Sequence, residues 1–203
     1  MEELLNKLRF NNINGYIVQD REEAKRIALE LIPEGASIAM GNSLTLREIG
    51  LFEAVTGGGY NVINQFEQGI SAEENLKRRK AGLTADVYFS GTNAITLDGE
   101  LVNIDGKGNR VAAMMFGPDK VIVIAGENKI VTSLEEAWTK IKEKTAPALA
   151  KRLGRSTPCA STQICGNCAS PERICRLYTV IGGQMPADKD RIHAIIVKEN
   201  LGI

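Results

Sequence analysis

Cysteine is absent from most of this 203-residue chain, since all four thiols fall between residues 157 and 175. Histidine is scarcer still, with one residue at position 193. A Ser-His-Asp hydrolase would also need a Gly-x-Ser-x-Gly turn, and because none is present the sequence gives that class no support. A Gly-x-Gly-x-x-Gly fingerprint and a P-loop are missing too, so nothing indicates a nicotinamide or nucleoside-triphosphate site.

Net charge and long apolar runs are also lacking. Twenty-five basic residues balance 25 acidic ones, and the sequence pI is about 6.6. This balance predicts neither nucleic acid nor a membrane surface as a partner. No stretch approaches the roughly 18 apolar residues of a membrane span, and the first twenty residues lack the apolar core of a secretory signal. We therefore expect a cytoplasmic protein, in a reducing compartment that disfavours disulfides.

The cysteines that are present form one tight cluster with the spacing Cys159-x5-Cys165-x2-Cys168-x6-Cys175. Gly and Asn between the middle pair permit the tight turn that points two thiolates at one ion. Clustered cytosolic cysteines are more often metal ligands or redox thiols than disulfides. The sequence therefore predicts a metal-binding loop over residues 157–175.

The identity of the metal stays open. Four thiolates suit an iron–sulfur cluster or a tetrahedral zinc ion, and the spacing matches neither the common ferredoxin run nor the paired C-x-x-C zinc ribbon. An iron–sulfur cluster is favoured over zinc, and zinc over free or redox-active thiols. A closed four-ligand site could also serve only as a structural staple for this part of the chain.

Helix-capping boxes alternate with short apolar runs along the first 140 residues. A box places a Ser, Thr or Asp oxygen three residues before a Glu. The four boxes begin at Asp20, Thr45, Ser71 and Ser133. The runs GYIV, SIAM, YNVI, DVYF and VIVIA are continuous rather than alternating, which is typical of strands covered on both faces. The pattern predicts an α/β fold with three layers around a Rossmann-like, mainly parallel sheet.

One local exception and the C-terminal segments complete the predicted domain. Asp98-Gly99 in NAITLDGELVNI favours a β-hairpin inserted into the parallel sheet. The helix after Ser133 is expected to kink or restart at Pro147. Two strands are expected after the cysteine loop, in RLYTVIGG and RIHAIIVKENLGI. We expect a single domain over residues 1–203, with the cysteine loop connecting its last helix to those strands.

Two turns between strands and helices are candidate ligand sites, because ligands gather beyond the carboxyl ends of parallel strands. The first runs from Met40 to Thr45, and the second from Asp105 to Arg110. Glycines in such turns allow close approach, and their amides, hydroxyls and cations suit a carboxylate or phosphate. The predicted ligand-binding residues are Gly41, Asn42, Ser43, Thr45, Asn93, Asn103, Asn109 and Arg110.

The hairpin between these turns supplies the candidate catalytic carboxylates, Glu100 and Asp105. A carboxylate opposite an anion site could abstract a proton next to a carbonyl. His193 is interpreted as a partly buried strand residue satisfied by a hydrogen bond rather than as a catalytic base.

The stretch from ADVYFSGTNAITLDGE to GENKI, followed by TPCASTQICGNCASPERIC and RIHAIIVKENLGI, resembles the LUD-domain proteins of the lactate utilization family. The resemblance runs essentially from end to end. It implies a fold similar to the ribose-5-phosphate isomerase and CoA-transferase group. It also implies a link to iron–sulfur complexes that oxidise L-lactate, in which this chain would be the small partner or a stand-alone relative. Asn93 stands where sugar-phosphate isomerases carry a carboxylate, so isomerase chemistry would need Glu100 or Asp105 instead.

Three functions follow from these patterns. The leading hypothesis is a LUD-type protein that binds a small carboxylate or phosphorylated ligand and carries an iron–sulfur or zinc centre. The second is a stand-alone sugar-phosphate isomerase or CoA-transferase-like enzyme whose metal is structural. The third is a non-catalytic subunit of an iron–sulfur oxidoreductase with cysteine-rich partner subunits. A homo-oligomer is left open.

Overall fold

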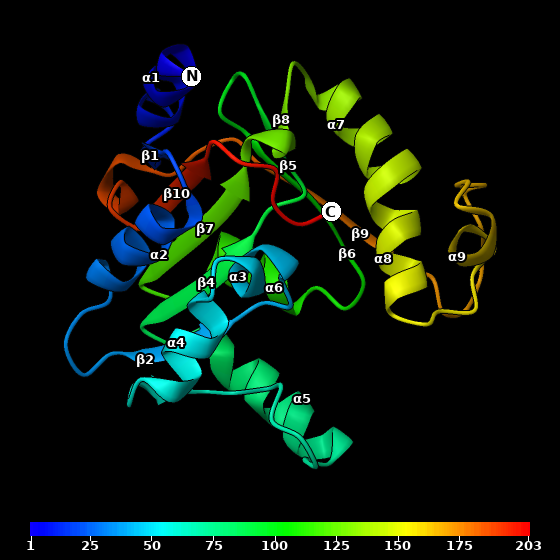
Figure 1. Ribbon diagram of the computed structural model, residues 1–203, viewed down its shortest axis with the longest axis horizontal. Coiled ribbons are helices and arrows are strands. Elements are labelled where there is room, and N and C mark those ends of the chain that lie inside the picture. The colour runs from blue at the N-terminus through cyan, green and yellow to red at the C-terminus, as the bar shows by residue number, and fades with distance from the viewer.

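Six parallel strands form the main sheet of the computed structural model, which describes residues 1–203 (Figure 1). Every pairing in this sheet is parallel, which confirms the predicted arrangement. Each expected apolar run contributes one strand, although the third run yields only two residues. Across the sheet the strands are β1 (Asn14–Val18), β10 (Ile192–Val197), β7 (Lys120–Gly126), β4 (Val87–Gly91), β2 (Ser37–Met40) and β3 (Asn61–Val62).

A second sheet of four strands lies beside the main sheet. Its order is β8 (Ile130–Val131), β5 (Ala94–Thr96), β6 (Leu101–Asp105) and β9 (Leu177–Ile181). The hairpin predicted around Asp98-Gly99 is confirmed as β5 and β6, which pair antiparallel. It is not a simple insertion, however, because β8 extends it on one side and β9 on the other. Of the two predicted C-terminal strands, β9 joins this second sheet and β10 enters the middle of the main one.

The helices are α1 (Glu2–Phe10), α2 (Arg21–Glu30), α3 (Leu44–Glu48), α4 (Leu51–Gly57), α5 (Ala72–Ala81), α6 (Asn109–Met115), α7 (Leu134–Lys140), α8 (Ala146–Arg152) and α9 (Pro158–Thr162). Helices α1, α2, α3, α4 and α6 cover the two faces of the main sheet, and α7 packs on the second sheet. Short helical turns are η1 (Gly82–Thr84), η2 (Glu127–Lys129), η3 (Ile141–Thr145) and η4 (Pro186–Asp188). None of the helices combines the length and apolar character that crossing a bilayer would require.

Three of the four predicted caps are confirmed. The side chains of Asp20, Ser71 and Ser133 each accept a hydrogen bond from the backbone N–H three residues later. The fourth is wrong, because Ser43 rather than Thr45 caps α3. Thr45 lies inside the helix and is buried, so its hydroxyl cannot reach the free N–H groups of the first turn.

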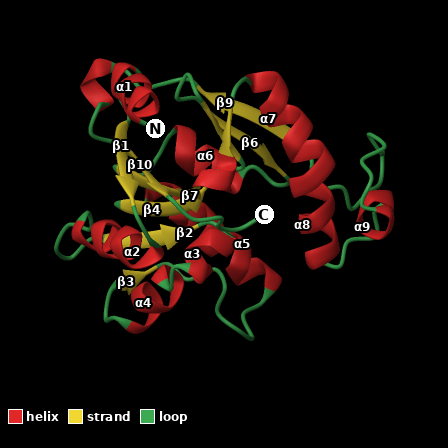
Figure 2. Ribbon diagram, turned by 45° about the horizontal axis from the view of Figure 1, so that its top comes forward, coloured by secondary structure: helices red, strands yellow, loops and turns green.

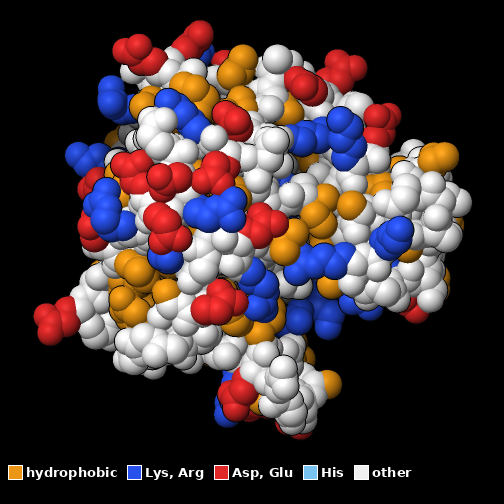
Figure 3. All heavy atoms as spheres, in the orientation of Figure 1, with side chains coloured by type: hydrophobic (Ala, Val, Ile, Leu, Met, Phe, Trp, Pro, Cys, Tyr) orange, Lys and Arg blue, Asp and Glu red, His pale blue; other side chains and the backbone are white.

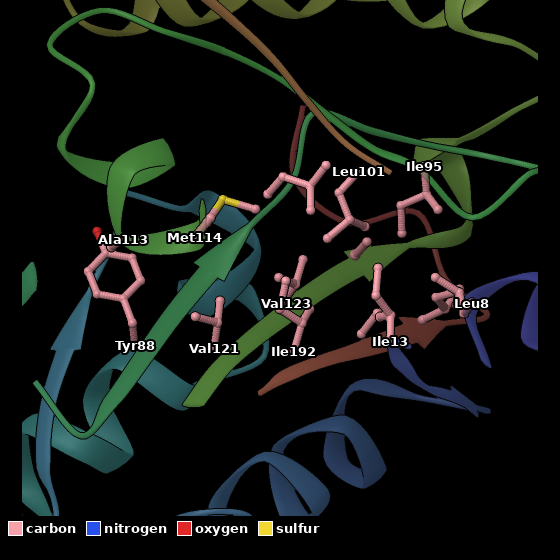
Figure 4. Close-up of a cluster of buried hydrophobic side chains, with 14 of the residues drawn as sticks. Leu8, Ile13, Tyr88, Ile95, Leu101, Ala113, Met114, Val121, Val123 and Ile192 are labelled. Atoms are coloured by element: carbon pink, nitrogen blue, oxygen red, sulfur yellow. The ribbon is translucent and has the colours of Figure 1, made fainter. Parts of the chain in front are cut away.

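The core lies on both faces of the main sheet, as three layers require. One apolar cluster packs α2, α3 and α4 against it, and the other fills the space between the sheet, α1, α6 and the β5–β6 hairpin (Figure 4). Neighbouring residues of β7 alternate between the clusters, with Val121 and Val123 in one and Ile122 and Ile124 in the other. Burying each such side chain contributes about 1.5–3 kcal/mol, and this two-sided burial explains why the runs do not alternate in polarity.

One helical rod carries the chain from the sheets to the cysteine loop. It consists of α7, the π-helical turn η3 and α8, and Pro147 occupies the first turn of α8. A widened turn just before Pro147 fits the expected restart, because proline cannot donate a hydrogen bond to the preceding turn. Figure 2 shows α7 along the second sheet and α9 further out, beyond α8. The cysteine loop therefore lies at the periphery of the molecule.

Candidate functional site

The two predicted glycine-rich turns meet at the carboxyl end of β4. This end lies next to those of β2 and β7, because β4 is between them in the sheet. The Gly41 N–H donates to the carbonyl of Phe89 across 2.8 Å. A Cβ on Gly41 would lie 3.2 Å from Cδ of Arg110, so glycine allows the first turn to rest directly on the side chain supplied by the second.

Arg110 ties this edge together. Its Nη1 donates to the Gly91 carbonyl at 3.2 Å and to Oδ1 of Asn103 at 2.6 Å. Its Nη2 donates to the Ile104 carbonyl at 3.1 Å, and Nε lies 3.6 Å from a carboxylate oxygen of Asp105. Burial lowers the pKa of Arg110, an effect that the Asp105 carboxylate opposes. Because the guanidinium donors are already engaged, any anion bound here would have to compete with these internal partners.

The amides of Asn93 and Asn103 close the junction between β4 and the second sheet. Asn93 Oδ1 accepts from the Ile104 N–H at 2.8 Å, and Asn103 Oδ1 accepts from the Asn93 N–H at 3.2 Å. Asn103 is fully buried, yet its Nδ2 has no hydrogen-bond partner. An enclosed donor without an acceptor costs about 1–3 kcal/mol. Such an exception calls for an explanation, and a bound ligand or water is one.

The remaining predicted residues divide into those at this edge and those away from it. Ser43 approaches Gly91 so closely that a Cβ there would lie 2.7 Å from its hydroxyl. Thr45 is buried, whereas Asn42 is exposed. Asn109 begins α6. The nearby Tyr88 hydroxyl is buried without a hydrogen-bond partner, and burial raises the pKa of Tyr88 to about 12.

The two candidate catalytic carboxylates lie in different places. Asp105 belongs to the edge, where it accepts from the backbone N–H groups of Gly106 and Val111. Glu100 lies at the turn end of the hairpin and accepts from the hydroxyl of Thr96. The structure therefore does not bring Glu100 to the cluster around Arg110.

Lys129 is the residue at this edge that sequence patterns did not single out. It lies in η2, directly after β7, and is 3% exposed. Burial, together with the nearby ammonium of Lys140, lowers its pKa to about 8. One signal in the sequence could have identified Lys129. It is a polar residue just past a parallel strand, and ligands bind beyond the carboxyl ends of such strands.

The four cysteines line one small cavity at the start of the cysteine loop, together with Arg173, Lys142 and Tyr178. No disulfide joins them, and Cys159 is the most buried. The Arg173 guanidinium pins the loop by donating to the carbonyls of Cys168 at 2.8 Å and Cys175 at 2.7 Å. The fold thus gathers the thiols around a common space.

This gathering stops short of a coordination sphere. No group of three or more Cys, His, Asp or Glu side chains has the geometry to hold a metal ion where it stands. Burial raises the pKa of the Cys175 thiol, and the neighbouring thiols Cys165, Cys159 and Cys168 add to that rise. The donor chemistry fits a soft metal, whereas the metal centre itself stays a prediction.

The cysteine loop ends where the Arg110 cluster begins. The Arg176 N–H donates to the Asp105 carbonyl at 3.0 Å, and a Cβ on Gly106 would lie 3.4 Å from the Ile174 carbonyl. Register places Asp105 opposite Leu177 in the β6–β9 pair. The two predicted sites therefore share the end of one strand pair.

His193 lies in β10 and is buried. Its Nδ1 hydrogen-bonds the Tyr16 hydroxyl at 3.0 Å, and its Nε2 lies 3.0 Å from the Asp190 carbonyl. Burial lowers its pKa. The interpretation as a satisfied strand histidine is confirmed.

Three solved structures are similar to parts or all of this chain, and the first of them shares its fold. A DUF162 family protein from Deinococcus radiodurans matches with 17% identity and a TM-score of 0.55, over 97% of this chain and 94% of that one. Ribose 5-phosphate isomerase from Plasmodium falciparum matches with 21% identity and a TM-score of 0.34, over 55% of this chain and 52% of that one. An eIF2B beta–delta complex from C. thermophilum matches with 17% identity and a TM-score of 0.44, over 86% of this chain and 55% of its matched chain.

No curated protein matches the sequence. The model of the LUD domain, however, matches residues 1–197. This span includes both sheets, the Arg110 cluster and the cysteine loop. The chain therefore belongs to the LUD domain family.

Proposed function

We propose that this chain is a cysteine-ligated metal protein linked to the utilization of lactate or another small organic acid. The observation that carries the proposal is the convergence of Cys159, Cys165, Cys168 and Cys175 on one cavity. In a chain without other cysteines, four free thiols around a common space supply the soft sulfur ligands that iron–sulfur clusters and zinc take.

An iron–sulfur cluster is the favoured occupant, and zinc is the alternative. Thiolate is the usual ligand of iron–sulfur clusters and also binds zinc well. The four cysteine sulfurs would hold the group, while Arg173 would keep the backbone of the loop in place. Iron–sulfur would supply one-electron transfer, whereas zinc would leave the loop a structural staple.

The organic-acid half of the proposal rests on the carboxyl edge of the main sheet. The unpartnered Nδ2 of Asn103 and the hydroxyls of Ser43 and Thr45 supply hydrogen-bond donors there. Donors suit a carboxylate or phosphate, which is an acceptor. The last residues of the cysteine loop lead into β9, which pairs with the end of β6 beside the Arg110 cluster, so the loop and this edge are joined through one strand pair.

Anaerobic metal and sulfide analysis tests the metal centre. An iron–sulfur protein would contain iron and acid-labile sulfide and would show broad visible absorption that bleaches on reduction. A colourless protein with one zinc per chain would remove the redox role and keep the site. Cys168→Ser should abolish stoichiometric metal in either case, and Ser170→Ala, two residues away, provides the matched control. Metal-free protein from an anaerobic preparation, with all four thiols reactive, would contradict the proposal.

A further inference from the structure

Lys129 is a buried cation that makes no hydrogen bond and no ion pair within the fold, although the Glu48 carboxylate lies near enough to raise its pKa. Its side chain belongs to a residue only 3% exposed. Its pKa responds to burial and to the charges of Lys140 and Glu48, but to no hydrogen bond. Lysine is almost never buried to this extent unless it is paired, because removing an ammonium from water is expensive. The position therefore needs a physical reason.

The charges around Lys129 leave an excess of positive potential. Lys140 lies close enough to depress the pKa of Lys129, and its own ammonium donates to the Asn128 carbonyl. Glu48 is the nearby carboxylate, but it makes no ion pair with Lys129 and instead accepts from the Gly202 N–H at 2.6 Å. In Figure 3 Lys and Arg side chains gather between the body of the protein and the α7–α8 helix, on the face where the chain ends.

Hydroxyl donors lie beside this cation. A Cβ on Gly202 would be 2.6 Å from Oγ1 of Thr45 and 3.7 Å from Nζ of Lys129, so both groups border the same point. Gly202 has φ +68, a conformation that suits glycine, and this lets the chain turn closely over the two side chains. Ser43 occupies the adjoining position over Gly91.

These groups come from three adjacent strands. Ser43 and Thr45 follow β2, Gly91 ends β4, and Lys129 follows β7. Their convergence at the carboxyl ends of parallel strands is the geometry in which α/β sheets bind ligands. The ammonium can only donate hydrogen bonds, and each hydroxyl donates when its O–H points toward the ligand. A carboxylate or phosphate accepts hydrogen bonds from all three groups.

Comparison with Arg110 separates a ligand-binding cation from a structural one. Arg110 is also buried, but carbonyl, amide and carboxylate oxygens of its own chain satisfy its guanidinium. Lys129, at the neighbouring strand end, has no such set. The fold has thus satisfied one cation internally and left the other available.

We propose that Lys129 is the cation of a small-anion site, in which its ammonium and the hydroxyls of Ser43 and Thr45 bind a carboxylate or phosphate. The inference rests on the organic-acid half of the proposed function and is independent of the metal. The sequence predicted Arg110 as the cation that binds the anion, whereas this inference assigns that role to Lys129, which follows a different strand.

Isothermal titration calorimetry of the full chain with sodium L-lactate and with inorganic phosphate, at pH 7 and constant ionic strength in chloride, tests this inference. The wild-type protein should bind one anion per chain, and the tighter of the two identifies the source as a carboxylate or a phosphate. Lys129→Met should weaken that binding at least tenfold. Lys120→Met, which removes an equal charge at the opposite end of β7, should leave it unchanged.

A second measurement keeps the test valid if Lys129→Met fails to fold. In the wild-type protein, the ¹³Cε resonance of Lys129 should shift on titration with the bound anion, while that of Lys120 stays in place. Binding that survives Lys129→Met, or a Lys129 resonance that ignores the anion, would overturn this inference but leave an organic-acid site elsewhere. A wild-type protein that binds neither anion would overturn both this inference and the organic-acid half of the proposed function.

Discussion

The carboxyl edge of the main sheet and the cysteine loop both gather polar groups, but they are held in different ways. At the edge, Arg110 binds backbone and side-chain oxygens from β4, β6 and the turns that follow them. In the loop, Arg173 binds only backbone carbonyls, and the thiols face a cavity without a shared partner. Internal hydrogen bonds therefore fix the guanidinium at the edge, whereas in the loop they fix only the backbone and leave the thiols without partners.

This difference affects what each region can do. A site whose geometry is fixed before the ligand arrives loses little ordering entropy on binding. A loop that gains its final geometry from a metal couples the free energy of metal binding to its own folding. Under the proposed function, the edge would therefore bind its small molecule with little rearrangement, and the loop would be ordered further by its metal.

The sharpest way to break this comparison is to remove the guanidinium of Arg110. We expect Arg110→Met to lower the free energy of unfolding by about 3–5 kcal/mol, because it leaves the Asp105 carboxylate and several buried oxygens without their partner. Urea denaturation measures this. Arg176→Met is the control, since the side chain of Arg176 is exposed and donates to one carbonyl, that of Pro171. Equal losses for the two variants would mean that the edge is not held by Arg110.

Metal loading should produce the next largest effect, and only through the cysteine loop. Metal at 100 to 1,000 times its dissociation constant should raise the free energy of unfolding by about 3–4 kcal/mol. Cys165→Ser should lose this gain, yet differ from wild type by less than about 1 kcal/mol once a chelator is present. Paired denaturation curves with and without metal report both quantities. A cysteine variant that loses stability equally in both would show that the thiols act by packing.

The pH dependence of stability tests whether Lys129 is strained in the folded protein. Its folded pKa of about 8 lies below its usual value of 10.5, so between these limits the unfolded chain binds more protons. The penalty for burying the ammonium is fully present below pH 8 and disappears as the pH rises to 10.5. The free energy of unfolding of wild type should therefore rise relative to Lys129→Met, by up to about 3 kcal/mol across this window.

Denaturation of both proteins at several pH values gives that difference directly. The comparison cancels the titration of residues that the two proteins share, including Cys175. Parallel pH profiles would mean that Lys129 ionises as it does in water. Saturating phosphate or lactate should flatten the wild-type rise, because a bound anion stabilises the charged ammonium.

The smallest effect concerns the cap of α3. Ser43→Ala should lower the free energy of unfolding by about 0.5–1 kcal/mol, because the Ser43 Oγ accepts from the Leu46 N–H across a long 3.4 Å. Ser133→Ala, at a shorter cap of 3.2 Å away from the edge, should cost about 1 kcal/mol. Only Ser43→Ala should also weaken anion binding, and calorimetry would show whether the two variants separate in this way.

Much of the fold could be predicted because local patterns were strong. Asp20, Ser71 and Ser133 cap the expected helices, since each side-chain oxygen accepts from the N–H of the third helical residue and needs no distant partner. The Thr45 box failed because Ser43, two residues earlier, offered the same chemistry. Whether Ser43 or Thr45 caps α3 depends on where β2 ends, and the end of β2 depends on its pairing with β4.

The candidate site was predicted less completely. The sequence predicted that Ser43, Asn93 and Arg110 would lie near strand ends, and the structure brings them together. The sequence did not indicate that oxygens of the same chain would bind the Arg110 guanidinium. Lys129 was missed because its burial comes from segments far away in sequence, including Thr45 and Gly202.

The sequence by itself determined the periodicity of the strands, three helix starts, the hairpin turn and the grouping of the thiols, because each depends on residues within a few positions of one another. Only the tertiary structure decided that β9 would join a second sheet, that the Arg110 guanidinium would be bound by internal oxygens and that Lys129 would be buried without an ion pair. Those outcomes depend on which distant segments exclude water from a given side chain, and no local pattern encodes that.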